Sequence, residues 1–308
     1  MSTLWAFPGQ GAQRPGMLHA LPDSALVQNC LTEASHALGE PVIDQDSAER
    51  LGDTRAVQLC LLVAGVACAR LLTERGHRPD YVAGLSIGAY AAAVTAEALD
   101  FADAVRLVAL RGELMQRAYP QGFGMTAILG LDQPSLERLL AEASGPVYLA
   151  NINADNQLVI AGSDAAMAVV AKQARAQGAS AAKRLAMSVP SHCELLAAPA
   201  AELREAFADV PMRRPRFAYL SGSSARLVND SERLRDDLAG NMSCVVNWQA
   251  TLQTAYERGA RLHLEMPPGA VLSGLARRVF APGQVIAFEA ARLDTLDALL
   301  REEVSRSR

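Results

Sequence analysis

The chain has 308 residues, of which 50% are hydrophobic and 20% charged, and its formal net charge is -4. A chain of this length can bury a large core without disulfides or a structural metal, and the composition excludes a fibrous, disordered or disulfide-framework protein. Because no block of like charge stands out, we expect neither a nucleic-acid partner nor a membrane partner.

The first 119 residues alternate predicted strands with predicted helices. A short apolar strand enters a glycine-rich turn at residues 8–11, and Asp53 and Asp100 are expected to cap helices. This alternation indicates a parallel sheet covered by helices. The predicted elements are strands 4–7 and 80–83 and helices 54–75, 89–98 and 101–119.

Residues 123–190 follow a different order of strand, helix, strand, strand, helix and strand, which is the ferredoxin-like pattern. We predict that they form a small subdomain inserted into a larger discontinuous domain of residues 1–122 and 191–308. The predicted elements of the insert are strands 125–129, 147–152, 157–160 and 182–189 and helices 134–143 and 165–177. Helices 194–208 and 245–257 and strands 217–220 and 261–265 follow it.

The start of the chain and its cysteines predict a cytoplasmic protein. The first basic residue is Arg14, so the basic region of a secretory signal is missing. The cysteine count is five, an odd number without a C-x-x-C motif, which fits a reducing compartment. The apolar run 56–69 is shorter than the ~20 residues of a membrane span and predicts a buried helix. The histidines show no metal-ligand spacing, so we expect no metal site.

A G-x-S-x-G motif at residues 84–88 lies between a predicted strand and a predicted helix, which is the context of a nucleophile elbow. Such a turn raises the serine, here Ser86, above the edge of the sheet. The N–H groups that follow it lie at a helix N-terminus, where they favour negative charge. The alternative is a glycine-rich turn that contains a serine by chance.

A nucleophilic serine needs a base, since a free hydroxyl is a poor nucleophile at neutral pH. His192 follows the insert at the junction of the two domains, where clefts form, although it could instead cap the helix that begins near Glu194. His263 is the rival base, but its strand is apolar and favours a structural role. Cys193 is an alternative nucleophile without a glycine elbow, which favours a buried spectator thiol.

Arg111 is the most informative charge. Arg106 and Arg117 on the same predicted helix have Asp103 and Glu113 within pairing distance, whereas Arg111 has no carboxylate nearby. Its neighbours three and four residues away are all apolar: Leu107, Val108, Leu114 and Met115. A buried, unpaired guanidinium is costly, so an anion must meet it. The anion is either a distant Asp or Glu or a substrate carboxylate held by two hydrogen bonds.

The glycine loop at residues 9–16 lacks the residues of a nucleotide-binding loop. The spacing from Gly11 to Gly16 matches a P-loop, but Met17 and Leu18 replace the lysine and hydroxyl residue that hold phosphate and magnesium. A turn that brings a backbone N–H close to Ser86 remains possible.

Together these segments resemble the malonyl-CoA:acyl-carrier-protein transacylase family, in the family's order over nearly the whole chain. The resemblance implies an α/β fold with a hydrolase-like large domain and a ferredoxin-like insert. The matching segments are residues 7–13, 84–90, 100–116, 150–153, 159–162 and 268–275, with His192 and Trp248.

The resemblance also implies a role for each candidate residue. Ser86 would be the acylated nucleophile, His192 its base, and Arg111 the group that binds the malonyl carboxylate. The supporting roles fall to the backbone N–H groups of Gln10 and Ile87 as an oxyanion hole, to Met115, and to Asn241, whose backbone carbonyl would orient the histidine.

The implied reaction moves a malonyl group from malonyl-CoA through a Ser86 acyl-enzyme to the phosphopantetheine-type thiol of an acyl carrier protein, with no permanently bound cofactor. Leu85 and Ala89 stand where the family commonly has histidine and glutamate. This elbow and the opening segment 5–18 look closest to the malonyltransferase subunit of bacterial malonate decarboxylase, which implies that enzyme's carrier and other subunits as partners.

Three alternatives remain open. The first is a malonyl-CoA:acyl-carrier-protein transacylase of fatty-acid or polyketide synthesis. The second is a serine thioesterase or esterase on the same elbow, which would release the free acid in water. The third is a non-catalytic binding subunit with a decayed elbow. The basic loop containing Arg213, Arg214 and Arg216 is either a solvated loop or a local docking patch for an acidic carrier.

Overall fold

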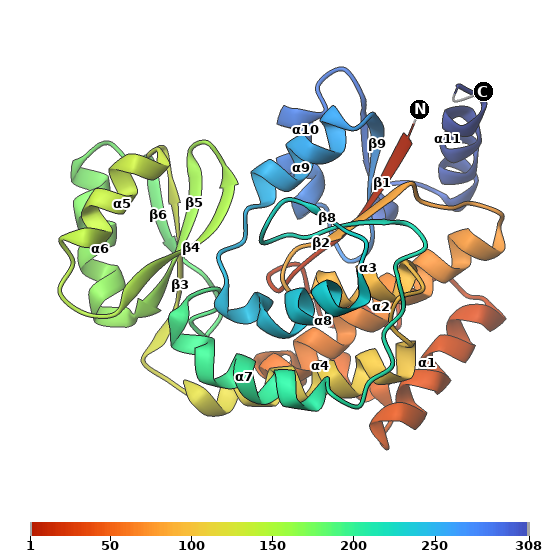
Figure 1. Cartoon of the computed structure of the whole chain (residues 1–308), viewed down its shortest axis with the longest axis horizontal. Coiled ribbons are helices and arrows are strands. Elements are labelled where there is room, and N and C mark those ends of the chain that lie inside the picture. The colour runs from red at the N-terminus through yellow and green to blue at the C-terminus, as the bar shows by residue number, and fades with distance from the viewer. Residues whose placement is uncertain (1, 307–308) are drawn as a thin grey trace.

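The computed structural model describes residues 2–306 and consists of two units that lie side by side (Figure 1). The larger unit contains a six-stranded sheet whose strands are β1 (Ser2–Phe7), β2 (Tyr81–Gly84), β7 (Ala218–Leu220), β8 (Leu227–Val228), β9 (Ala260–Glu265) and β10 (Gln284–Ala287). They are arranged in the order β10-β9-β1-β2-β7-β8. Five strands are parallel as predicted, and β8 adds an antiparallel edge.

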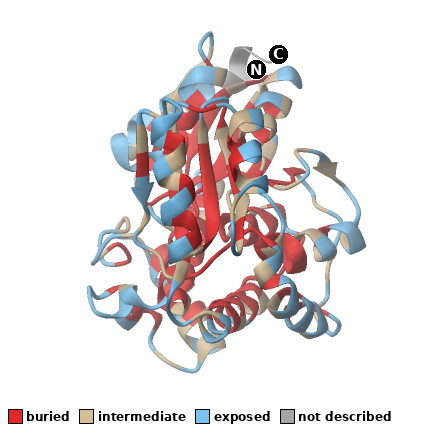
Figure 2. Ribbon diagram, turned by 90° about the vertical axis from the view of Figure 1, so that its left-hand side faces the viewer, coloured by how far each residue is buried: buried red, intermediate tan, exposed pale blue. Residues whose placement is uncertain are grey.

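Alternating side chains of β1 supply the two cores of this unit. Trp5 and Phe7 face one side of the sheet, and Leu4 and Ala6 face the other. The first side is covered by α1 (Ala25–Leu38), α2 (Thr54–Glu74), α3 (Gly88–Thr95), α4 (Phe101–Ala118), α7 (Ala197–Ala206), α8 (Ser231–Gly240) and α11 (Leu293–Arg306). The second is covered by α9 (Trp248–Glu257) and α10 (Val271–Val279). Figure 2 shows the buried strands between these layers.

Helix α2 is the apolar run that the sequence predicts as a buried helix. The Asp53 carboxylate caps it by accepting hydrogen bonds from the backbone N–H groups of Arg55 and Ala56. By length and composition alone α2 could cross a membrane, but 89% of its most apolar window is buried inside the protein. Its side chains pack between α1, α3 and α4, which confirms the prediction of a core helix.

The smaller unit contains the predicted order of elements, namely β3 (Phe123–Leu129), α5 (Gln133–Ala141), β4 (Val147–Ala154), β5 (Gln157–Ser163), α6 (Asp164–Ala176) and β6 (Ala181–Arg184). Its four strands form an antiparallel sheet in the order β4-β5-β3-β6. One face of the sheet is covered by α5 and α6 (Figure 1). The limits of the insert at residues 123 and 190 stay a prediction.

The last strand of the insert is shorter than the predicted range 182–189, because β6 ends at Arg184. The Arg184 guanidinium donates to the backbone carbonyl groups of Phe123 (2.7 Å) and Met125 (3.0 Å) on the adjacent strand β3. The Met125 carbonyl still accepts from the Leu185 N–H (2.9 Å), which would continue the sheet. The Phe123 carbonyl, the next acceptor, is used by the guanidinium instead, and the Met187 N–H donates to the Leu185 carbonyl (2.8 Å). The chain leaves the sheet here, and Leu185 and Met187 line a cavity between the two units.

The predicted helix 245–257 also begins later, at Trp248. The residue two positions earlier, Val246, exchanges backbone hydrogen bonds with β4, since its N–H donates to Ala150 (2.9 Å) and its carbonyl accepts from Ile152 (2.8 Å). Asn247 then caps α9 with its side chain. This short bridge ties the smaller unit to the larger one beside the cavity.

Candidate active site

The tight turn between β2 and α3 presents Ser86. Ser86 adopts a left-handed backbone conformation, with a φ of 57°, which a non-glycine residue keeps only where its surroundings enforce it. A Cβ atom on Gly84 would lie 2.0 Å from the carbonyl carbon of Gly88, and one on Gly88 would lie 2.2 Å from the carbonyl oxygen of Phe7. The turn therefore requires both glycines, as the elbow motif predicts.

The imidazole of His192 lies against the Ser86 hydroxyl. The distance from His192 Nε2 to Ser86 Oγ is 2.8 Å, and His192 Nδ1 lies 2.8 Å from the backbone carbonyl oxygen of Asn241 and 3.2 Å from that of Cys244. A carbonyl can only accept a hydrogen bond, so the neutral ring must carry its proton on Nδ1. Nε2 is then free to accept the proton of Ser86.

The surroundings of His192 keep the ring neutral. Burial and, after it, the positive charge of Arg111 lower the pKa of His192 to about 4, although the two carbonyl acceptors act in the opposite direction. The histidine is thus a base throughout the neutral pH range, and it takes a proton only when its surroundings compensate the charge.

Arg111 approaches Ser86 from α4, with Nη2 at 3.4 Å from Ser86 Oγ. Its side chain is completely buried, as the apolar neighbours predict. Besides Ser86 Oγ, its hydrogen-bond acceptors are neutral amides: Gln58 Oε1 at 2.7 Å and Asn241 Oδ1 at 3.1 Å. Among residues 2–302, whose side chains the structure describes, no carboxylate pairs with it, so no distant Asp or Glu of this range meets the guanidinium.

Ser86 and His192 open into a cavity of about 250 Å³ between the two units. Gln10 and Ile87 lie on its wall beside Ser86. Within the described chain the backbone N–H groups of Gln10 and Ile87 have no hydrogen-bond partner, so both are available to an oxyanion. Asn151 and Asn153 from β4 also line the cavity, and the buried Oδ1 of each has no partner among the described residues, so it can accept from a ligand N–H.

Comparison with known proteins identifies the family. The family model described as the acyl transferase domain matches residues 4–289. The malonyl CoA-acyl carrier protein transacylase of Haemophilus influenzae is 37% identical over 289 residues, which span 91% of this chain and 93% of that protein. The chain belongs to this transacylase family.

Solved structures of relatives share the fold. The acyl-carrier-protein S-malonyltransferase of Burkholderia pseudomallei matches with a TM-score of 0.92 and 36% identity, over 98% of this chain and 100% of that one. A malonyl-transacylase in complex with its type II polyketide synthase acyl-carrier protein matches with a TM-score of 0.88 and 36% identity, over 93% of this chain and 96% of that one. These matches establish the α/β fold with its second, antiparallel sheet.

Gln58 is a site residue that the sequence patterns did not reveal; it lines the cavity and contacts Arg111. Its amide Nε2 donates to Met115 Sδ at 3.3 Å, so Met115, the supporting residue implied by the resemblance, positions Gln58. The one feature of the sequence that could have indicated Gln58 is its position as a single polar side chain in the apolar run 56–69. The side chain of Asn241, which contacts both Arg111 and the Ser86 carbonyl, was also not predicted.

The two rivals lie in apolar surroundings. His263 is buried in β9 with its ring 5.7 Å from that of Phe280, and neither ring nitrogen has a partner in the described chain. Cys193 is buried and donates to the Pro190 carbonyl at 3.4 Å. Burial raises the pKa of the Cys193 thiol to about 11, so it carries almost no thiolate at neutral pH.

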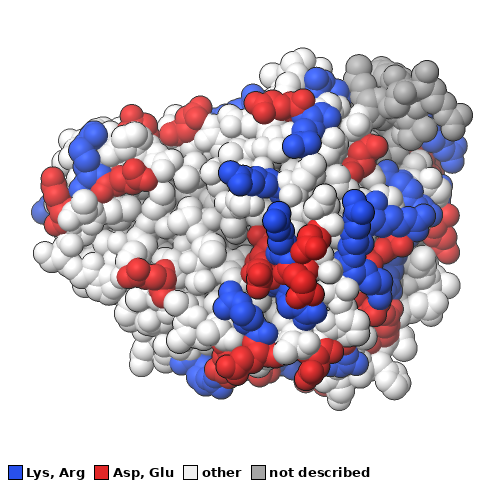
Figure 3. All heavy atoms as spheres, in the orientation of Figure 1, with Lys and Arg blue, Asp and Glu red and all other residues white. Residues whose placement is uncertain are grey.

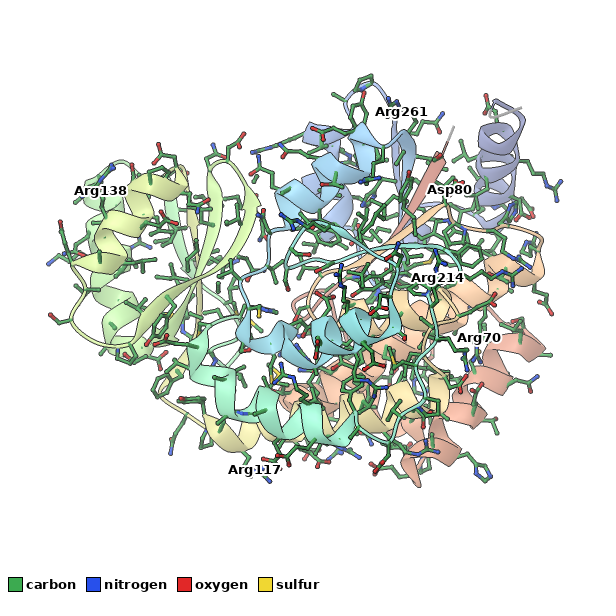
Figure 4. All side chains as sticks on the ribbon, in the orientation of Figure 1. Arg70, Asp80, Arg117, Arg138, Arg214 and Arg261 are labelled. Atoms are coloured by element: carbon green, nitrogen blue, oxygen red, sulfur yellow. The ribbon has the colours of Figure 1, made fainter. Side chains whose placement is uncertain are left out.

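Of the two ion pairs predicted on α4, one forms and the other does not. Arg106 pairs with Asp103 as expected, but Glu113 pairs with Arg55 of α2 at 2.8 Å and not with Arg117. Arg117 lies at the outer edge of α4 (Figure 4) and pairs with Glu202 of α7. Packing of α4 against α2 and α7 therefore overrides the local pairing.

The basic loop lines a separate cavity that shares no residue with the active-site cavity. Arg213 pairs with Asp100 at 2.6 Å and Arg216 with Glu97 at 2.9 Å, so local carboxylates balance these charges. On the face shown in Figure 3, basic and acidic side chains lie side by side over the larger unit. Among the described residues, no group of three or more His, Cys, Asp or Glu side chains could hold a metal ion.

Proposed function

We propose that this chain transfers a malonyl group from malonyl-CoA to the phosphopantetheine thiol of an acyl carrier protein. The observation that carries this proposal is the position of the Ser86 hydroxyl between two groups. His192 Nε2 lies 2.8 Å away on one side and Arg111 Nη2 lies 3.4 Å away on the other. A base and a free cation thus meet at one nucleophile, which suits an acyl group that carries a carboxylate.

The first half-reaction forms an ester on Ser86. Ser86 Oγ attacks the thioester carbonyl while His192 Nε2 takes the hydroxyl proton. The developing oxyanion accepts hydrogen bonds from the N–H groups of Gln10 and Ile87, and losing one such donor typically costs about 10²- to 10³-fold in rate. The carbon–sulfur bond then breaks, and the CoA thiolate takes the proton from His192.

The second half-reaction reverses these roles. The carrier thiol gives its proton to His192 and attacks the malonyl ester, and the Ser86 oxygen regains the proton as it leaves. The Asn241 carbonyl holds the ring in the tautomer that both halves need. No step requires a metal or redox cofactor, because all proton transfers pass through one imidazole.

Arg111 links substrate choice to the strength of the base. Its positive charge is one of the two causes that lower the pKa of His192. A malonyl carboxylate on Arg111 compensates that charge and raises the pKa of His192 in the complex. The histidine therefore becomes a stronger base when a carboxylated acyl group is bound.

The carrier is best assigned to fatty-acid or polyketide synthesis, because the relatives described above are acyl-carrier-protein transacylases by name. The carrier subunit of malonate decarboxylase is the second candidate. It is favoured by Leu85 and Ala89 in the elbow and by the opening segment 5–18, and it would add that enzyme's other subunits as partners. Transfer rates to the two purified carriers, each with its own prosthetic group, separate the candidates.

Two further features of the chain belong to this proposal. The order β3-α5-β4-β5-α6-β6 supports a ferredoxin-like insert at residues 123–190 in a hydrolase-like domain of residues 1–122 and 191–308. The odd number of cysteines without a C-x-x-C motif supports a cytoplasmic location.

The transfer reaction is tested with radiolabelled malonyl-CoA, with and without holo acyl carrier protein. We expect label on the carrier and little free malonate. Release of malonate at the same rate without a carrier would instead identify a thioesterase. Failure to form any acyl-enzyme would favour a non-catalytic subunit with a decayed elbow.

A further inference from the structure

The guanidinium of Arg111 is held by neutral partners alone. Gln58 Oε1 accepts from Nη1 at 2.7 Å, and Asn241 Oδ1 accepts from Nη2 at 3.1 Å. The Nε donor is buried without a partner in the described chain. A completely buried positive charge thus lacks a counter-charge and part of its hydrogen bonding, which is an unfavourable state for a resting protein.

Both amides are fixed in orientation by their nitrogen ends. Gln58 Nε2 donates to Met115 Sδ at 3.3 Å, and Asn241 Nδ2 donates to the Ser86 carbonyl at 3.3 Å. Because the donors are engaged elsewhere, the amide oxygens face the guanidinium. The two side chains therefore imitate the oxygen atoms of a carboxylate without carrying its charge.

Gln58 stands between the cavity and the cation. It lines the cavity together with Ser86 and Met115, whereas Arg111 does not. An acyl carboxylate that enters from the cavity therefore meets Gln58 first and must replace its oxygen on Arg111. This exchange is favourable because the carboxylate brings the negative charge that the guanidinium lacks and two oxygens that match its planar fork, whereas the amide offers one neutral oxygen.

We propose that Gln58 is a neutral place-holder for the substrate carboxylate and a specificity-determining residue, an inference that rests on the proposed malonyl transfer. A carboxylate at position 58 would pair with Arg111 permanently and repel an incoming carboxylate. The neutrality of the amide, more than its shape, leaves the charge of Arg111 available for a carboxylated acyl group. An uncharged acyl group such as acetyl gains nothing from that charge.

The test uses the isosteric substitution Gln58→Glu. The second-order rate constant for acylation of Ser86 is measured with malonyl-CoA and with acetyl-CoA, and the ratio of the two is compared with that of the wild type. We expect the malonyl-to-acetyl ratio to fall by roughly 10- to 100-fold, the range for losing one charged hydrogen-bonded pair. The matched control Gln58→Met has similar length and no charge, and it should keep the preference for malonyl-CoA.

An unchanged ratio in folded Gln58→Glu would overturn the inference, and so would an equal fall in Gln58→Met, because the amide would then act only through packing. If Gln58→Glu does not fold, Asn241→Asp brings a carboxylate to the same guanidinium, and an unchanged ratio there has the same meaning. A wild-type protein that takes no malonyl group at all would refute the proposed function instead.

Discussion

The His192 ring and the backbone carbonyl of Asn241 are joined by a hydrogen bond of 2.8 Å from Nδ1. The side chain of the same asparagine contacts Arg111 and the carbonyl of Ser86. One residue at the end of α8 therefore touches the nucleophile, the base and the cation. Asn241 therefore holds His192 and Arg111 in fixed positions relative to each other, although the two residues come from distant parts of the chain.

Arg111→Ala should remove the preference for a carboxylated acyl group. We expect malonyl transfer to fall and relative use of acetyl-CoA to rise, because the only cation beside Ser86 in the described structure is lost. The malonyl-to-acetyl ratio of acylation rates measures the effect. Arg117→Ala is the matched control, since Arg117 lies on the same helix but pairs at the surface with Glu202. An unchanged ratio in Arg111→Ala would exclude the assigned role.

The rate of Ser86 acylation should fall in acid only at a pH well below the usual pKa of a histidine. Burial and Arg111 hold the pKa of His192 at about 4, against a usual value of 6.5. The second-order rate constant, which reports the free enzyme, should therefore hold as the pH falls through 6.5 and decline only toward 4. Arg111→Ala should move this midpoint upward, because the imidazolium loses a repelling charge. A wild-type midpoint near 6.5 would contradict the buried, neutral base.

Gly88→Ala should damage both the fold and the turn. Its Cβ would lie 2.2 Å from the Phe7 carbonyl oxygen, so β1 or α3 must shift, at a cost of about 1–3 kcal/mol or more. Denaturant unfolding and acylation rates give the two readouts. Gly274→Ala is the control, because that position in α10 has open space and alanine favours a helix by about 0.5–1 kcal/mol. Equal stability of the two variants would show that the turn tolerates a side chain.

His263→Leu should keep acyl transfer and make the protein less sensitive to acid. Burial lowers the pKa of His263 to about 3, so its contribution to stability is complete above 6.5 and is lost as the pH falls from 6.5 toward 3. At pH 5 this loss amounts to about 2 kcal/mol. Unfolding free energies at pH 7 and pH 5 should therefore differ less in the variant than in the wild type. If the His263→Leu variant lost acyl transfer, His263 would again be a candidate for the catalytic base.

The sequence predicted the parts of the site that local patterns encode. The glycines around Ser86 predict a tight turn, and the apolar neighbours of Arg111 predict its burial. It could not predict which side chains meet the guanidinium, because Gln58 and Asn241 lie 53 and 130 residues away. Such contacts depend on how the helices pack against one another, which no local periodicity contains.

Contacts between distant segments also explain two wrong predictions, one at the end of a strand and one for a surface ion pair. The strand predicted to reach residue 189 stops at Arg184 because the Arg184 guanidinium takes the Phe123 carbonyl, the acceptor that a longer strand would need. Glu113 pairs across two helices instead of along its own. In both cases a tertiary hydrogen bond or ion pair outweighs the pattern along the chain.

The central claim is that Ser86 carries the acyl group, and intact-protein mass spectrometry after incubation with malonyl-CoA tests it most directly. We expect the mass of one malonyl group on the wild-type protein, mapped by peptide analysis to Ser86, and no adduct on Ser86→Ala. A malonyl adduct that persists on Ser86→Ala, with Cys193 the first position to inspect, would contradict that claim.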